Sequence, residues 1–361
     1  MASSGSIVVE LEYVRGFLSA LQGLHWRNNA AGTFSGAGGA TGTAAPGNVN
    51  AGNVNASVFG ASHVVERMHA TGRPGARAHC ELHFTKDGLK VCVEDDSKAV
   101  QAVATLRVAL FRSYEYRSIM EKTRVGVSLV RLLDALQPFA TCAATGAPLR
   151  IRYPGADGAL VLEMDETEPP LRLTAELRTM EASMGQVFQD FFDADAPAVE
   201  FAMNGALLKE AVDDLGWANA PVALTIHKNP ARLALRSAGA TGGEVEVLFD
   251  TIRGLDMKVG EETANELVFR YKHKYLAAAF SNVQASSYGG GQLRTKVLVD
   301  KEGIMRVVHL VSILDHYGGE MLQQQVADKT NHGVVIVRFC ILPEDDDVVD
   351  AHDDDDDDAG V

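Results

Sequence analysis

The sequence predicts an α+β fold of two domains, because one short unit occurs four times along the chain. The unit is an amphipathic helix followed by two strands that a tight turn joins. The clearest hairpin is Leu82–Glu94, where apolar residues alternate with polar ones on both sides of Lys86-Asp87-Gly88. Alternation around an Asp-Gly pair is a strong local signal for a β-hairpin. Such internal repetition determines the architecture of a chain.

Four amphipathic helices are expected, at about 13–26, 127–137, 205–215 and 271–283. Each carries apolar residues at i, i+3, i+4 and i+7, which form one face of a helix. Pro138 is expected to end the second helix, and Asn204 to cap the third.

Strands fill the rest of each unit. The second, third and fourth hairpins are expected to turn at 154–158, 228–230 and 300–303. Further strands are expected at IVVEL, LRLTAEL, AVEFAM, EVEVLFD and VVIVRFCIL, whereas 100–116 is ambiguous between strand and short helix and 314–332 is expected to be a loop. Two units together form one domain, with both helices on one side of a curved antiparallel surface. The expected divisions are an N-terminal domain at 1–177, a connector at 178–197, a C-terminal domain at 198–343 and an acidic tail at 344–361.

Two segments have compositions typical of disorder. Residues 28–62 contain no charged side chain and are rich in Gly, Ala and Asn, so we expect a disordered insertion over 28–76. A phosphate-binding loop is the alternative there, but no Gly-rich phosphate motif occurs. The net charge is −15, and eleven of the acids lie between Glu344 and Asp358, so the rest of the chain carries only −4. A nearly neutral body can still have a local basic face, so nucleic acid is not excluded as a partner.

The composition argues against a membrane or secreted protein. No apolar run approaches the roughly 20 residues of a membrane span, and we expect no signal peptide. The four cysteines, Cys80, Cys92, Cys142 and Cys340, are scattered, so reduced buried thiols are expected.

The repeated unit is the one that builds DNA sliding clamps such as PCNA. An ordered series of segments resembles the Rad-one subunit family of the nine-one-one DNA-damage checkpoint clamp. The segments are VRGFLSALQGLHWR, TKDGLKVCVED, VQAVATLRVALF, LVRLLDALQPF, RYKHKYL, LRTKVLVDKEGIM and VRFCILPEDDD. The resemblance covers about residues 7–27 and 77–345. The insertion departs from the family, and the connector matches it poorly.

This resemblance implies a PCNA-like fold with helices lining the inner face and antiparallel sheets outside. It implies a ring of three different subunits that encircles double-stranded DNA without reading sequence. The partners it implies are two sister clamp subunits, a checkpoint clamp loader, and repair proteins and checkpoint mediators. It implies a role in checkpoint signalling and repair, a nuclear location, no membrane and no cofactor or metal.

Candidate DNA-facing residues are the basic side chains expected on the four helices: Arg15, Arg131, Lys209, Lys272 and Lys274. Threading DNA through a ring needs mobile neutralisation of phosphates, which Lys and Arg provide. Arg131 and Lys274 lie opposite the apolar stripes of their helices, whereas the place of Lys272 rests on the resemblance. Ordinary solvated side chains are the alternative for each of the five.

A metal-dependent 3′-5′ exonuclease on the same fold is the alternative function. Glu163, Asp165 and Glu166 cluster on and after a hairpin strand, and paired carboxylates can bind catalytic metal. Carboxylates at a strand end are more often simply solvated, so no catalytic residue is assigned.

Deleting residues 28–76 should leave the thermal midpoint within about 2 °C of the full chain, because a segment that buries no core contributes little to stability. Thermal unfolding followed by circular dichroism measures this. A loss of several degrees would mean that the segment packs against a domain.

Overall fold

The computed structural model describes residues 5–25, 79–142, 146–167, 170–185, 188, 192, 197–216, 220–239, 242–252, 254–261, 263–281, 294–313 and 333–344. The expected insertion 28–76, the expected loop 314–332 and the acidic tail beyond Glu344 lie outside these residues. Among the described residues, no helix has the length and hydropathy that a membrane crossing requires.

The described residues of the first half form two helices and nine strands. They are β1 (Ser6–Leu11), α1 (Val14–Gln22), β2 (His79–Thr85), β3 (Gly88–Glu94), β4 (Val100–Arg107), β5 (Ser113–Arg117), β6 (Lys122–Ser128), α2 (Leu129–Cys142), β7 (Leu149–Tyr153), β8 (Leu160–Thr167) and β9 (Pro170–Leu177). Short 3-10 turns lie at Val108–Leu110 and Ala156–Gly158.

The second half repeats this order. It contains β10 (Val199–Asn204), α3 (Gly205–Asp214), β11 (Pro221–His227), β12 (Arg232–Ala238), β13 (Glu244–Asp250), β14 (Asp256–Val259), β15 (Glu266–Lys272), α4 (His273–Ser281), β16 (Arg294–Val299), β17 (Met305–Ser312) and β18 (Val334–Ile341). The fourfold helix-and-hairpin unit predicted from the sequence is therefore confirmed.

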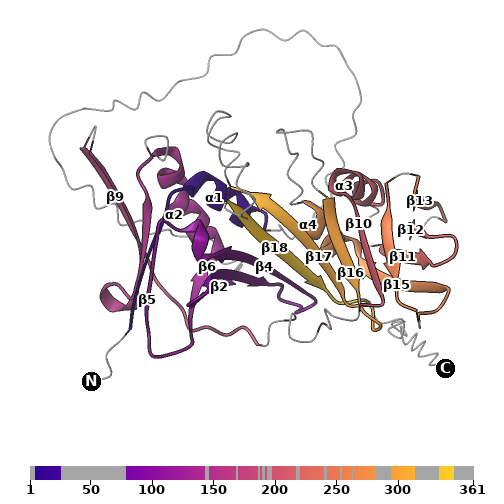
Figure 1. Cartoon of the computed structure of the whole chain (residues 1–361), viewed down its shortest axis with the longest axis horizontal. Helices are drawn as coiled ribbons and strands as arrows, with labels where there is room; N and C mark the ends of the chain where they lie inside the picture. Colours follow the sequence, from indigo (N-terminus) through magenta and orange to yellow (C-terminus); the bar gives the residue numbers. More distant parts are fainter. Residues whose placement is uncertain are drawn as a thin grey trace, which may run out of the picture.

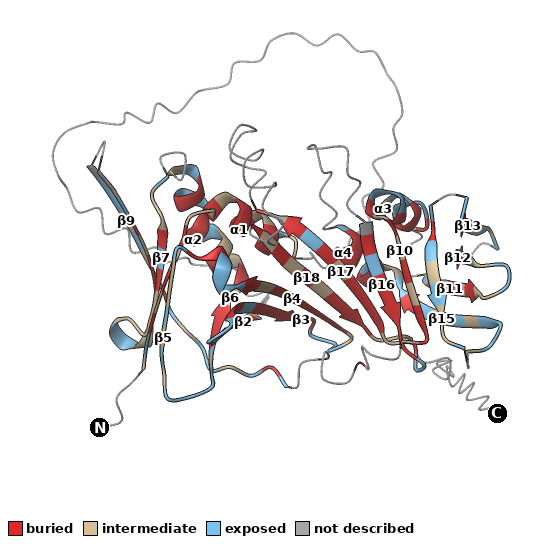
Figure 2. Ribbon diagram, viewed as in Figure 1, coloured by how far each residue is buried: buried red, intermediate tan, exposed pale blue. Residues whose placement is uncertain are grey.

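The strands form three sheets. A central nine-stranded sheet has the order β14-β10-β16-β17-β18-β4-β3-β2-β6, so it runs through both halves. A five-stranded sheet, β5-β1-β7-β8-β9, closes one end, and a four-stranded sheet, β13-β12-β11-β15, closes the other. All four helices lie along the upper side of the view in Figure 1, with the end sheets at left and right. Figure 2 shows that the central strands are largely buried.

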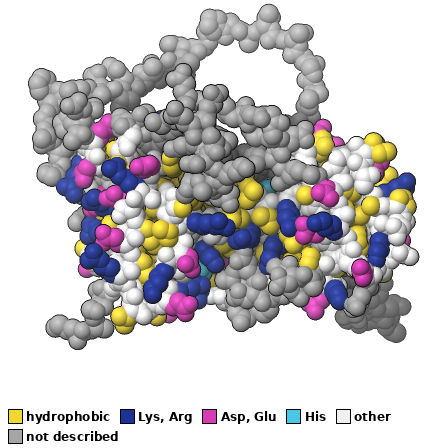
Figure 3. Space-filling model, viewed as in Figure 1, with side chains coloured by type: hydrophobic (Ala, Val, Ile, Leu, Met, Phe, Trp, Pro, Cys, Tyr) yellow, Lys and Arg dark blue, Asp and Glu magenta, His cyan; other side chains and the backbone are white. Residues whose placement is uncertain are grey.

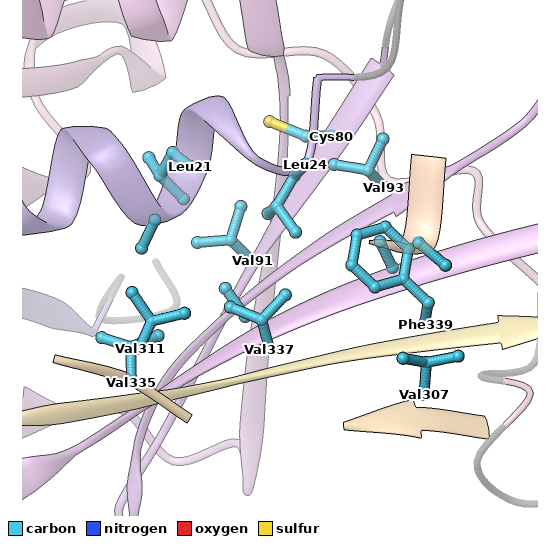
Figure 4. Close-up of a cluster of buried hydrophobic side chains, with 14 of the residues drawn as sticks. Leu21, Leu24, Cys80, Val91, Val93, Val307, Val311, Val335, Val337 and Phe339 are labelled. Atoms are coloured by element: carbon cyan, nitrogen blue, oxygen red, sulfur yellow. The ribbon is translucent and has the colours of Figure 1, made fainter. Parts of the chain in front are cut away.

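The two halves share one hydrophobic core. Val337 and Phe339 of β18 point inward beside Leu21 of α1 and Val91 of β3 (Figure 4), and all four are at most 1% exposed. Full burial of one such side chain contributes about 1.5–3 kcal/mol. The cluster therefore stabilises the junction of the halves as well as each half.

The first hairpin has the predicted turn. Thr85 of β2 pairs with Gly88 of β3, and Gly88 has φ +138°. A Cβ atom there would lie 2.1 Å from the carbonyl oxygen of Leu106, so only glycine fits.

Several sequence-based boundaries are wrong. Helix α2 continues through Pro138 to Cys142 instead of ending at the proline. Phe139 and Ala140 beyond it are buried, and this packing outweighs the hydrogen bond that proline cannot donate. Residues 271 and 272 belong to strand β15, which was not predicted, although Leu267, Phe269 and Tyr271 follow the period of two of a half-buried strand. The ambiguous segment 100–116 contains strands β4 and β5.

Cys80, Cys92 and Cys340 are buried, as predicted, whereas Cys142 is only partly buried. Asn204 caps α3 as predicted, because its side-chain oxygen accepts a hydrogen bond from the amide of Ala206 at 2.9 Å.

A polar contact also joins the two halves. The hydroxyl of Tyr275 on α4 donates to the carboxylate of Asp95 in the β3–β4 turn at 2.9 Å and lies 2.5 Å from the hydroxyl of Ser97. Burial acts to raise the pKa of Asp95, but the hydrogen bonds from Ser97 and Tyr275 and the charge of Lys274 hold this pKa below its usual value. The carboxylate therefore stays charged at the junction.

Tyr275→Phe should lower the free energy of unfolding by roughly 1–3 kcal/mol, because it removes a donor from a partly buried carboxylate. Urea unfolding at pH 7 measures the loss. Tyr116→Phe is the matched control, since the Tyr116 hydroxyl donates to a carbonyl in an exposed contact. Equal losses in the two variants would contradict a role for Tyr275 at the junction.

Candidate nucleic-acid interface

The candidate interface is the outward side of the four helices. Helices α1 and α2 pack together in the first half, and α3 and α4 pack together in the second. Each pair turns its apolar stripe toward the core, as Phe17 in α1 and Leu132 in α2 illustrate. The remaining faces carry the polar side chains that an object alongside the helices would meet.

Three of the predicted basic residues lie on these helices, and each already contacts another group of the chain. The Nε atom of Arg15 donates to the carbonyl of Ala140 near the end of α2, at 2.8 Å. Lys209 forms an i,i+4 ion pair with Asp213 on α3. Lys274 is exposed, with its ammonium nitrogen 4.7 Å from the ring centre of Tyr275, and its charge lowers the pKa of Asp95.

Arg131 and Lys272 differ from this group. Arg131 is exposed in the first turn of α2, opposite the buried stripe, as the helical period predicts. Lys272 is the last residue of strand β15 and so is not on a helix, which corrects its predicted place. Its ammonium lies 3.9 Å from the carboxylate of Glu344. Of the five basic residues, Arg131 is the best placed to contact a phosphate, because it is exposed on a helix opposite the buried stripe.

The four helices carry no net formal charge. They hold four basic side chains, Arg15, Arg131, Lys209 and Lys274, and four acidic ones, Asp134, Glu210, Asp213 and Asp214. Three of the acids are on α3. This face can make a few phosphate contacts, but one copy supplies little electrostatic attraction to a duplex.

A shallow groove between α1 and α2 adds neutral polar groups that the sequence analysis missed. Its volume is about 430 Å³, and its polar lining is Arg15, Ser19, Gln22, Gln137 and Thr141. Hydroxyl and amide side chains commonly bind phosphate oxygens. A search for basic residues alone could not find them, because only the packing of α1 on α2 brings them together.

The opposite face of the central sheet is also basic. In Figure 3, several Lys and Arg side chains lie over the middle of the view, interspersed with acidic and hydrophobic ones. Burial lowers the pKa of Arg338, and the charges of Arg306 and Arg107 lower it further. Arg338 lies between the inward Val337 and Phe339, so it points away from the helices.

The connector is attached to this same face. Glu81, which is fully buried, accepts hydrogen bonds from the amide of Met184 at 2.6 Å and from Arg124 at 2.7 Å. Burial acts to raise the pKa of Glu81, but hydrogen bonds from His83, Met184 and Arg124 bring it below the usual value. Further along, the guanidinium of Arg306 lies 4.0 Å from the ring centre of Phe192. The described part of the connector is thus fixed on the sheet.

Two of the three carboxylates considered for a nuclease, Glu163 and Asp165, form an ion pair with an arginine, whereas the Oε1 atom of Glu166 is buried without a hydrogen-bond partner in the described structure. Glu163 lies 3.0 Å from Arg152, and Asp165 lies 3.3 Å from Arg172. No group of three or more metal-ligating side chains occurs in the described parts of the chain. The geometry at β8 is that of surface ion pairs.

Helices on one side, sheets that merge across two similar halves, and open sheet edges at both ends define a sliding-clamp subunit. Solved clamps share the fold. The Proliferating Cellular Nuclear Antigen of Entamoeba histolytica matches with a TM-score of 0.58 at 10% identity, over 95% of this chain and 100% of that one. A chain of the PCNA2-PCNA3 complex of Sulfolobus tokodaii matches with a TM-score of 0.56 at 12% identity, over 93% and 99% of the two chains.

The chain belongs to the Repair protein Rad1/Rec1/Rad17 family, whose model matches residues 56–310. No curated protein matches the chain. The fold and the family together identify a checkpoint sliding-clamp subunit, as the resemblance in the sequence implied. The DNA-facing roles of the five basic residues stay predictions.

Arg131→Glu should shorten the time that the assembled ring stays on end-blocked duplex DNA, and Lys274→Gln should do so to a smaller extent. When the logarithm of the retention time is plotted against the logarithm of the salt concentration, removal of one phosphate contact should reduce the steepness of the slope by about one. Lys90→Glu is the matched control, because Lys90 is exposed on the face of β3 opposite the helices. Unfolding of both helix variants, or equal losses in the control, would contradict the assignment.

Proposed function

We propose that this chain is the non-catalytic subunit of a three-membered checkpoint clamp that encircles duplex DNA in the nucleus. A dedicated clamp loader places the ring at damaged sites, and the ring supports checkpoint signalling and repair. The helix face contacts phosphates without reading bases. The connector face, with its three arginines, is the surface proposed to receive repair proteins and checkpoint mediators.

One observation carries the proposal. Strand β18 of the second half pairs with β4 of the first half, from Ile341 opposite Val100 to Ile336 opposite Thr105. The strands that correspond to these two, β9 and β13, lie at the edges of the two end sheets. A head-to-tail contact of the same geometry between chains therefore continues the sheet from subunit to subunit and closes a ring.

The charges favour unlike neighbours over three copies of this chain. The helix face carries no net charge, and the body without its acidic tail carries −4. A ring of three copies would have to hold a polyanion with an inner surface that is neutral overall. Sister subunits with more basic helices would supply the missing attraction.

The ion pairs at β8 support a non-catalytic role, since Arg152 and Arg172 pair with Glu163 and Asp165, two of the three carboxylates that a metal would need. No observation in the described residues favours the exonuclease.

Alone, the chain should be a monomer that binds duplex DNA weakly at physiological salt, and with its two sister subunits it should form a one-to-one-to-one complex. Light scattering on the separate and mixed proteins measures the masses. A stable trimer of this chain alone would make it a self-sufficient clamp and contradict the proposal.

A further inference from the structure

Among the described strands, β9 and β13 lie at the edges of the two end sheets, at opposite ends of the molecule. Strand β9 pairs only with β8, and β13 pairs only with β12, in the described structure. Figure 1 places β9 at the far left and β13 at the far right. An edge strand offers its free backbone groups to any strand of matching length, so side chains must decide which strand is accepted.

The internal junction between β4 and β18 supplies the register for these edges. Leu177 ends β9 opposite the first residue of β8, just as Ile341 ends β18 opposite the first residue of β17. In a contact between two chains, Leu177 of β9 would therefore occupy the position that Ile341 of β18 has in the internal junction, and Glu176 would occupy the position of Cys340.

The other edge strand, β13, is matched to β4 by counting residue pairs from the turn of the hairpin that precedes each of them. The fourth pair from the turn is Leu82 with Val91 in the first half and Leu224 with Leu235 in the second. Val91 pairs onward with Ala104, and Leu235 pairs onward with Val247. Val247 therefore takes the place of Ala104, and three residues earlier in each strand Glu244 takes the place of Gln101.

Two copies of this chain would then meet with like charges opposed. Cys340 faces Gln101 in the internal junction, so Glu176 of one copy would face Glu244 of the next. Both glutamates are exposed. Like charges directly opposite each other on neighbouring strands are destabilising.

The apolar partners in the same register fit well, so charge is what distinguishes the neighbours. Leu173 would face Val247, and both side chains are partly buried on the core side of their strands. Arg172 would lie diagonal to Glu246, but it already contacts Asp165 at 3.3 Å.

The β13 edge is acidic even after its internal ion pairs. Arg236 of β12 lies 3.1 Å from Glu244 and 3.1 Å from Glu246, so one guanidinium serves two carboxylates. A Lys or Arg on an arriving strand, opposite Glu244, would balance the remaining charge.

We propose that Glu244 and Glu246 select a neighbouring clamp subunit whose edge strand carries a basic residue at the position facing Glu244. Glu176 at the other end rejects a second copy of this chain by the same contact. The inference rests on the proposed ring and adds the chemistry by which it chooses unlike neighbours.

A charge-swap cycle on the full chain tests the register. Glu176→Lys or Glu244→Lys alone creates an opposite-charge pair between copies, and each should tighten self-association by roughly tenfold relative to the unchanged chain. The double variant Glu176→Lys with Glu244→Lys restores like charges and should return to weak association. Sedimentation over a concentration series measures each constant, and 1 M salt should reduce the gain.

Glu302→Lys is the matched control, since it makes the same change of charge in the exposed turn between β16 and β17. Circular dichroism confirms that each variant folds. Single variants that associate no more tightly than the control would overturn the proposal, and so would a double variant tighter than the singles.

Binding to each sister subunit separates this inference from the proposed function. Glu244→Lys should weaken binding of one sister subunit by roughly tenfold and leave the other unchanged. Equal effects on both sisters, or none, would overturn the charge selection while the ring stands. If the unchanged chain binds neither sister, the proposed function fails, and the self-association cycle still decides whether the edges select by charge.

Discussion

The antiparallel pairing of β4 with β18 is the contact on which the rest of the structure depends. It fuses the strands of the two halves into one nine-stranded sheet. It also brings Phe339 and Val337 into the core beneath the helices of the first half. The first half contributes β4 to this seam and has β9, the counterpart of β18, at the edge of an end sheet, whereas the second half contributes β18 and has β13, the counterpart of β4, at the other edge. The geometry that joins the halves is therefore the one proposed for the contact between subunits.

The sequence was sufficient to predict this architecture because the repeat is carried by strong local signals. The alternating residues around Asp87-Gly88 form the predicted hairpin. The apolar stripe of Phe17, Leu18 and Leu21 is the buried face of α1, as predicted. Weak local signals failed where packing decided the outcome. Pro138 lies inside α2 because Phe139 is buried. The prediction assigned the last two residues of β15, Tyr271 and Lys272, to the helix that follows. Because no turn residue separates β15 from α4, the composition does not show where the strand ends and the helix begins.

The sequence predicted which helices carry Arg15, Arg131, Lys209 and Lys274, but it misplaced Lys272 and could not show the surface that these residues share. Helical periodicity alone exposes Arg131. The i,i+4 spacing of Lys209 and Asp213 indicates their ion pair, but no pattern shows that Arg15 donates to a carbonyl near the end of α2. The neutral groove between α1 and α2 and the arginines around Arg338 arise from elements far apart in the chain. What results is a helix face without net charge, which is consistent with the proposed ring of unlike subunits.

Hydrogen exchange at the backbone amides of β9 and β13 tests the central claim most directly, because ladder hydrogen bonds protect amides from exchange. In the isolated chain, amides of β4 and β18 should be protected while the outward amides of β9 and β13 exchange fast. In the complex with both sister subunits, the amides of β9 and β13 should become protected and those of β4 and β18 should not change. Edges that still exchange fast in the assembled ring would contradict subunit pairing with the geometry of the internal junction.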